Sequence, residues 1–283
     1  MMIVFLNGKF VPETEAVVSA FDRGFLYGDG LFETLRVHRG APFRWDNHMR
    51  RFEQGAKLLN IPLPCPAHEL RAQADELVRV NRTTEAVLRI TLSRGVGPRG
   101  YSPRGAGSPT LVMSLHAAPD ANCEPVPKWR TITASFRLPS NERLAQFKTC
   151  NKLTQIMARA EAEHAGADEA LLLNTDGKVV EAASSNLFWI SDATVCTPPL
   201  DSGILAGVTR IVVLEICARM DLPTREASII PAELARADGV FLSMSSWGIV
   251  ELTSLDGQEL RQSPLVGRIR EGYVGALETG HAQ

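Results

Sequence analysis

The amino-terminal third of the chain carries two kinds of hydrophobic pattern, one typical of strands and one typical of helices. Residues 3–11 alternate between apolar and polar around Asn7-Gly8, which predicts a hairpin. Apolar residues recur every three or four positions over 46–59, and Pro62 follows, so this segment is expected to be a helix. Similar patterns predict a helix over 66–80 and strands over 31–37, 86–93 and 110–115.

The rest of the chain shows the same mixture after a break in composition. Residues 117–128 hold three prolines and no periodic apolar pattern, so we expect them to link an amino-terminal domain, 1–116, to a carboxy-terminal domain, 129–283. Because the strands come in groups and the helices are inserted irregularly, the sequence favours an α+β architecture. The elements predicted beyond the linker are strands over 130–136, 169–174, 178–182, 187–190 and 194–197, and helices over 153–165, 208–220 and 264–277.

The composition is that of an ordinary globular protein. The 283 residues are enough for about two domains of usual size. Hydrophobic residues make up 45% and charged residues 22%, which argues against a disordered chain. The 30 Lys and Arg residues against 32 Asp and Glu residues leave a formal net charge of −2. This balance provides no basic field for binding nucleic acid.

Several absences narrow the class of protein further. No stretch approaches about 18 consecutive apolar residues, so we expect no membrane span, and the apolar start is too short for a signal peptide. The five cysteines include no Cys-x-x-Cys pair, which argues against a zinc ribbon or a disulfide framework. The six histidines show no metal-ligand spacing. We therefore expect a cytoplasmic protein without a metal site.

A glycine-rich loop after the strand at 86–93 matches G-x-G-x-x-G over 95–100. A dinucleotide site would require a helix directly after this motif, and Tyr101-Ser102-Pro103 cannot begin one. The loop also carries Arg94, Arg99 and Arg104. It is therefore interpreted either as a carboxylate-binding loop, since guanidinium groups suit carboxylates, or as a solvated basic loop.

The most informative stretch is 181–210, EAASSNLFWISDATVCTPPLDSGILAGVTR. Glu181 ends a predicted strand, and Gly207 precedes the first turn of a predicted helix. The free N–H groups of that turn, with the Thr209 hydroxyl beside them, could hold a phosphate. The residues alone leave open a second interpretation, in which Thr209 only caps the helix.

The spacing over this stretch resembles the signature of the class IV aminotransferases, the fold-type-IV enzymes that use pyridoxal 5'-phosphate. A Glu is followed five positions later by Asn-Leu-Phe, then by Leu-x-Gly-Val-x-Arg. The resemblance extends from YGDGLFETLR near the amino terminus to SMSSWGIVEL near the carboxy terminus. It implies a two-domain fold with a barrel-like carboxy-terminal domain, a cofactor between the domains and a homodimer. It also implies that the loop at 27–30 acts across the dimer interface.

The resemblance assigns roles to individual residues. Lys148 matches the lysine that holds the cofactor as a Schiff base, a role that requires an amine which can lose its charge, as burial allows. Lys152 is the competing lysine. Glu181 matches the carboxylate that pairs with the pyridine nitrogen. Arg51 matches the arginine that holds the phosphate, whereas its neighbour Arg50 points about 100° away on a helix.

Further cofactor contacts follow from the same match. Val208 and Thr209 match the backbone N–H groups that complete the phosphate site. Ser184 and Ser185 match small residues close to the cofactor, and Ser245 resembles another contact to the phosphate or the substrate.

Two reactions and one non-enzymatic role are weighed. The loop SRGVGPRGYS resembles that of 4-amino-4-deoxychorismate lyase, which releases pyruvate and p-aminobenzoate, and Gly248 favours the same reaction. Arg99 and Tyr101 of this loop would then bind the substrate carboxylate. The alternative is an aminotransferase that acts on branched-chain or D-amino acids with 2-oxoglutarate. A third possibility, an inactive binding relative, would be expected to lack Lys148, Glu181 or Arg51.

Overall fold

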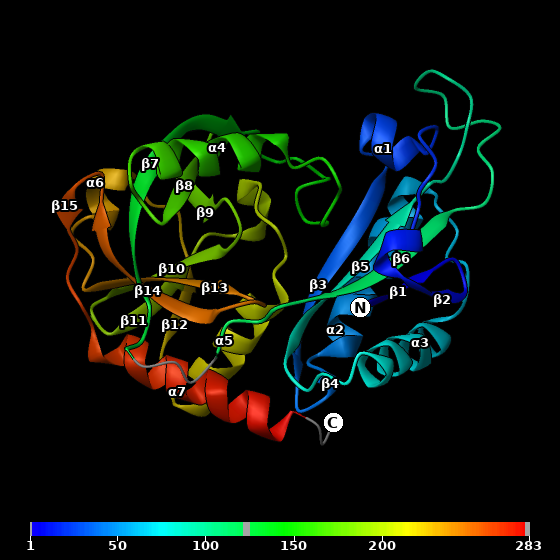
Figure 1. Ribbon diagram of the computed structural model, residues 1–283. Helices are drawn as coiled ribbons and strands as arrows, with labels where there is room; N and C mark the ends of the chain where they lie inside the picture. The colour runs from blue at the N-terminus through cyan, green and yellow to red at the C-terminus, as the bar shows by residue number, and fades with distance from the viewer. Residues whose placement is uncertain (1, 121–124, 281–283) are drawn as a thin grey trace. The chain divides into compact units, whose positions relative to one another are not determined.

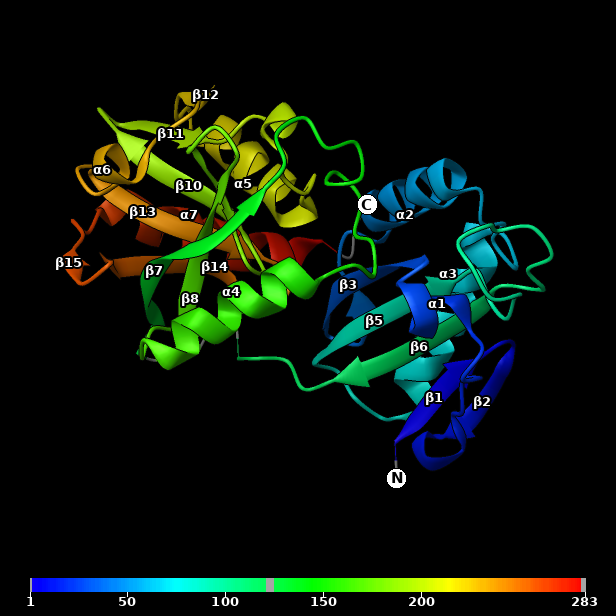
Figure 2. The same cartoon turned by 90° about the horizontal axis from the view of Figure 1, so that it is seen from above.

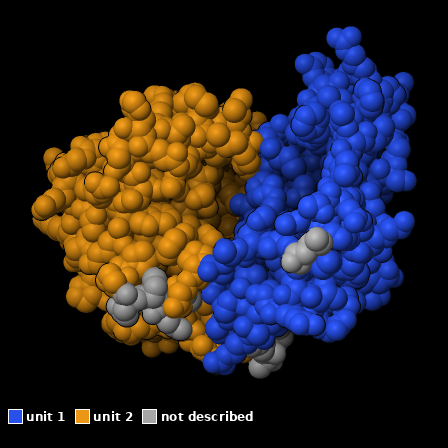
Figure 3. Space-filling view, in the orientation of Figure 1, with its two compact units in different colours: residues 1–118, 147–151, 280–283 blue, residues 119–146, 152–279 orange. Residues whose placement is uncertain are grey.

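The computed structural model describes residues 2–120 and 125–280, so residues 121–124 of the predicted linker lie outside the described part. The chain divides into two units, coloured separately in Figure 3. Unit 1 comprises residues 1–118, 147–151 and 280–283, and unit 2 comprises residues 119–146 and 152–279. The return of 147–151 to unit 1 was not foreseen, because the sequence analysis counted this segment in the carboxy-terminal domain.

Unit 1 is built on a six-stranded antiparallel sheet with the order β2-β1-β6-β5-β3-β4. Two helices, α2 and α3, cover one face of it (Figures 1 and 2). The predicted hairpin, both helices and the three strands are confirmed. The elements are β1 (Ile3–Leu6), β2 (Lys9–Pro12), η1 (Glu13–Glu15), α1 (Arg23–Tyr27), β3 (Gly30–His38), β4 (Ala41–Pro42), α2 (Trp45–Leu59), α3 (Ala67–Val80), β5 (Ala86–Ser93) and β6 (Thr110–His116).

The two faces of this sheet differ in chemistry. Successive side chains of a strand point to opposite faces, and Leu31 and Leu35 of β3 belong to the core beneath α2 and α3. Phe32 and Thr34 therefore point to the opposite face. There they lie across from Thr91 and Arg89 of β5 respectively, because these residues are register partners.

Residues 147–151 join unit 1 beside β3. The Phe32 N–H donates to the Lys148 carbonyl oxygen at 2.8 Å, and the Cys150 N–H donates to the Gly30 carbonyl oxygen at 2.9 Å. Leu31 and Thr149 form an isolated antiparallel bridge. Backbone pairing thus fixes the position of Lys148 against β3, although the two segments are more than a hundred residues apart in the sequence.

Unit 2 is built on a nine-stranded sheet, six strands of which close on themselves. The order β10-β13-β14-β7-β8-β9 returns to β10 through the pair Glu181↔Asn186. The predicted α+β class and barrel-like carboxy-terminal domain are confirmed. The elements are β7 (Lys128–Leu138), α4 (Leu153–His164), β8 (Glu169–Asn174), β9 (Val179–Ala182), β10 (Asn186–Ser191), β11 (Thr194–Thr197), η2 (Leu200–Ser202), α5 (Val208–Arg219), β12 (Thr224–Glu226), α6 (Pro231–Leu234), β13 (Gly239–Met244), β14 (Gly248–Leu255), β15 (Gln258–Glu259) and α7 (Pro264–Thr279).

The sequence analysis missed two central strands of this barrel, β13 and β14. Every residue of β13 is buried, and its run GVFLSM lacks the alternation that marks a half-exposed strand. The stacked pair Phe188 and Phe241, with ring centroids 5.0 Å apart, joins β13 to β10. In the described part of the chain, every helix is too short or too polar to span a bilayer.

Candidate functional site

The residues that the sequence analysis assigned to the site are divided between the two units, and each group is described by itself. Unit 1 holds Lys148, Arg51, Arg99 and Tyr101. Unit 2 holds Glu181, Ser184, Ser185, Val208, Thr209 and Ser245.

Two cations lie against one aromatic ring on the face of the unit 1 sheet opposite α2 and α3. The Lys148 Nζ is 4.9 Å from the centroid of the Phe32 ring, and the Arg89 Cζ is 3.8 Å from it. Aromatic faces attract cations, so the ring holds both groups on this face. Lys148 is half-buried, as an amine must be if it is to react without full hydration.

Arg89 is a candidate site residue that the sequence analysis missed. Its Nε donates to the Thr91 hydroxyl at 3.2 Å, and no carboxylate among the described residues pairs with its guanidinium. Burial lowers the pKa of Arg89. A half-buried guanidinium without a carboxylate partner is suited to bind an acidic ligand. The signal in the sequence was an arginine in the apolar strand AVLRITLS.

The opposite face of β3 carries a buried network that fixes Arg51. The Arg51 Nε donates to Glu33 Oε1 at 2.8 Å and its Nη2 donates to Glu33 Oε2 at 2.6 Å. The His48 Nδ1 lies 2.7 Å from the same Oε2. Glu33, His48 and Arg51 are all buried, and the neighbouring Arg50 is exposed as its helix position predicted.

The electrostatics of this network favour an ionised Glu33. Burial by itself would raise the pKa of Glu33, but the Arg51 guanidinium and the His48 hydrogen bond hold it down at about 2. Burial lowers the pKa of His48 in spite of the nearby Glu33 carboxylate. The Arg51 side chain is therefore held in one orientation by a partner that is charged at neutral pH.

In unit 2, Glu181 lies where the barrel closes. Its Oε2 accepts the Leu205 N–H at 2.9 Å, and the side-chain amide of Asn186 donates to the Leu205 carbonyl at 2.9 Å. A Cβ added at Gly207 would overlap the Asn186 Oδ1. The segment before α5 is thus held close to Glu181 and Asn186, and only glycine fits at 207.

The residues around the first turn of α5 fit a phosphate group. Gly207 is the N-cap and provides no side-chain hydrogen bond, so the N–H groups of the first turn have no cap within the described residues. The Ser185 Oγ and Ser243 Oγ are buried and have no hydrogen-bond partner among the described residues. Ser243 pairs with Asn186 across the strands and was not foreseen. Buried hydroxyl groups and helix N–H groups are suitable donors for the phosphate of the expected cofactor.

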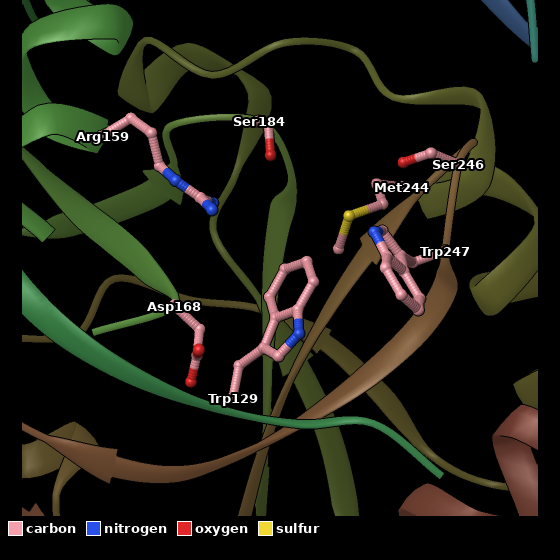
Figure 4. A pocket seen from close by; sticks show the side chains of 7 residues that line it. All are labelled: Trp129, Arg159, Asp168, Ser184, Met244, Ser246 and Trp247. Atoms are coloured by element: carbon pink, nitrogen blue, oxygen red, sulfur yellow. The ribbon is translucent and has the colours of Figure 1, made fainter. Parts of the chain in front are cut away.

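Ser184 makes a contact of a different kind. It is exposed, and its hydroxyl donates to the Oε2 of the fully buried Glu169 at 2.7 Å. It also lines a cavity of about 270 Å³ that lies entirely in unit 2 (Figure 4).

Arg99 and Tyr101 lie on the exposed loop between β5 and β6. Tyr101 is 89% exposed, and its ring lies 5.7 Å from that of Tyr27. The hydrogen bonds and ring contacts of the loop do not bring Arg99 or Tyr101 to Lys148. No helix follows the glycine motif in this loop, in agreement with the rejection of a dinucleotide site.

The two lysines considered for the Schiff base, Lys148 and Lys152, lie in different units. Lys148 pairs with β3 in unit 1, whereas Lys152 is the N-cap residue of α4 in unit 2. Lys148 therefore belongs to the face that carries Phe32 and Arg89.

Comparison with known proteins gives a consistent result. The family model described as amino-transferase class IV matches residues 30–255, most of the chain. A protein of Methanocaldococcus jannaschii named as a branched-chain-amino-acid aminotransferase is 36% identical over 95% of this chain and 92% of its own. The aminodeoxychorismate lyase of Bacillus subtilis (strain 168) is 30% identical over 90% of this chain and 87% of its own.

A solved structure extends the likeness to the fold. The branched-chain amino acid aminotransferase from T.th., solved with pyridoxamine 5'-phosphate, is 28% identical, with a TM-score of 0.93 over 99% of this chain and 95% of that chain.

Proposed function

The chain belongs to the class IV aminotransferases, and from this membership we propose that it is a lyase that converts 4-amino-4-deoxychorismate into p-aminobenzoate and pyruvate. The family uses pyridoxal 5'-phosphate, and the protein is a transaminase or a lyase that depends on this cofactor. The finer assignment is supported by the loop SRGVGPRGYS.

The single observation that carries the proposal is how this loop presents its side chains. The Arg23 Nη1 donates to the Gly100 carbonyl at 2.8 Å, and the Gly100 N–H donates to the Tyr27 hydroxyl oxygen at 2.9 Å. These bonds hold the backbone between Arg99 and Tyr101, while both side chains are exposed. A fixed loop with an exposed guanidinium and an exposed phenol is a suitable binding element for a carboxylate substrate.

The remaining residues have the following proposed roles. The bound cofactor supplies an electron sink that stabilises a carbanion of the substrate. Lys148 holds the cofactor and moves a proton at its Nζ, and Glu181 keeps the pyridine nitrogen protonated. Arg51, oriented by Glu33, binds the phosphate. Ser184, Ser185, Val208, Thr209 and Ser245 supply the remaining contacts to the cofactor.

The protein is also proposed to be a homodimer. Phe21 and Phe25 at α1 are 68% and 76% exposed, and Val17 is 74% exposed. Such a group of exposed apolar side chains is typical of an interface. Light scattering should give twice the 30.9 kDa of the chain, and Phe25→Asp should shift the mass toward that of one chain. A wild-type protein with the mass of one chain would contradict the proposal.

The second candidate is an aminotransferase. It is favoured by the 36% identity to the Methanocaldococcus jannaschii relative and by Arg89, whose guanidinium could bind the second carboxylate of 2-oxoglutarate. Two assays separate the candidates. We expect p-aminobenzoate to be released from 4-amino-4-deoxychorismate without any keto acid. Amino-group exchange between amino acids and 2-oxoglutarate, without release of p-aminobenzoate, would establish the second candidate and reject the first.

A further inference from the structure

The cavity of unit 2 has no role of its own in the assignments above, although its lining residue Ser184 is a proposed contact to the cofactor. Its volume is about 270 Å³, and it is lined in part by Trp129, Trp247, Met244 and Ser246. An apolar cavity of about 150 Å³ is already large enough to bind benzene. The cavity can therefore accept a six-membered ring with small substituents, although it is smaller than a typical pocket for a whole drug-sized ligand.

Two of the residues that line the cavity are aromatic. The rings of Trp129 and Trp247 have centroids 5.9 Å apart and an interplanar angle of 78°. Figure 4 shows Met244 and Trp247 on one side of the cavity and Arg159 on the other, with the Trp129 ring between them. Two perpendicular rings form a corner in which a planar ring can stack on one and meet the edge of the other. The Met244 sulfur adds a favourable contact for an aromatic ligand.

The charged groups near the cavity are already paired with one another. The Arg159 Nε donates to Glu163 Oε1 at 3.2 Å, and its Nη1 lies 3.6 Å from Glu169 Oε2. The carboxylate of Asp168 accepts the Arg130 N–H at 2.8 Å and points away from the other lining side chains in Figure 4. The cavity thus offers two indole rings and a thioether to a ligand, beside charged groups that are paired with one another.

The cavity adjoins residues with proposed roles at the cofactor. Ser184 is one of its lining residues, and Ser246 follows Ser245 in the chain. We propose that the cavity binds the unsaturated six-membered ring of the substrate, which becomes planar in p-aminobenzoate, and that Trp129 and Trp247 determine this specificity. That the bound ring faces the cofactor rests on the proposed function. The binding of a ring in the cavity does not rest on it.

The test compares two carboxylates of equal ring size. Benzoate is planar and aromatic, whereas cyclohexanecarboxylate is neither, and its saturated ring is at least as hydrophobic. A preference for benzoate therefore cannot come from apolar burial alone. We expect calorimetry with the cofactor-loaded protein to show benzoate binding about three to ten times more tightly.

Substitutions at the two tryptophans test whether these residues cause the preference for benzoate. Trp247→Leu and Trp129→Leu should each reduce the preference for benzoate to nearly onefold. Phe10→Leu is the control, because Phe10 is 39% exposed, Trp247 is 37% exposed, and each makes an edge contact with one other ring. This control should keep the preference. Circular dichroism melts check that each variant is folded.

Equal affinities in the wild-type protein would overturn the inference, as would a preference that survives both tryptophan substitutions. Release of p-aminobenzoate by a protein without ring preference would remove the inference and leave the proposed function standing. A preference for benzoate without release of p-aminobenzoate would support the inference and reject the proposed function.

Discussion

Replacing Glu33 by Gln tests whether the buried network of unit 1 contributes as much as its geometry indicates. The substitution keeps the size of the side chain and removes its charge. It removes the carboxylate that accepts two hydrogen bonds from the Arg51 guanidinium, a group that is only 8% exposed. Breaking a buried ion pair by removing one partner typically costs about 3–5 kcal/mol.

The pKa of Glu33 gives a second value for the free energy by which this network stabilises the folded protein. A carboxyl that titrates at about 2 in the folded protein instead of 4.5 corresponds to about 3 kcal/mol, at about 1.4 kcal/mol per pH unit. The folded state binds fewer protons than the unfolded state between these values. This contribution is therefore complete above about pH 5 and is lost as the pH falls from 4.5 toward 2. The lowered pKa of His48 acts in the same direction below its usual 6.5.

Urea denaturation of the cofactor-free protein measures the effect. We expect Glu33→Gln to lower the free energy of unfolding by about 3 kcal/mol at pH 7, with a gap to the wild type that narrows as the pH falls below 4.5. Glu76→Gln is the control, because Glu76 forms an exposed pair with Arg79 three residues away. The reasoning is refuted if Glu33→Gln is as stable as this control, or if the gap does not narrow in acid.

Three more substitutions test other parts of the site. Lys148→Ala should remain folded and lose the covalent cofactor, seen as the loss of the borohydride-sensitive visible absorbance; wild-type turnover would reject the assignment. Gly207→Ala should weaken cofactor binding at least tenfold in a fluorescence titration, because its Cβ would displace Asn186, and an unchanged dissociation constant would contradict this. Glu181→Gln should lower kcat by at least a hundredfold while the protein still binds the cofactor; a wild-type kcat would separate Glu181 from the reaction.

The sequence predicted those elements whose pattern is local. Helices α2 and α3 and strand β5 lie close to the predicted positions because each has one buried side, and this imposes a period on the sequence. Strand β13 was missed because it is buried along its whole length and so has no period. The family signature likewise identified Lys148, Glu181 and Arg51 from spacing alone, and their roles remain predictions.

The sequence by itself therefore determined the family, the expected cofactor and the two-part architecture, since these depend on composition, period and motif. Only the tertiary structure decided which distant residues meet. Backbone hydrogen bonds bring Lys148 to β3, where Arg89 shares the ring of Phe32. The hydrogen bond from the Leu205 N–H brings the segment before α5 to Glu181, 24 residues away in the sequence. Such contacts arise from pairing between segments far apart in the chain, and no local pattern of hydrophobic and polar residues records them.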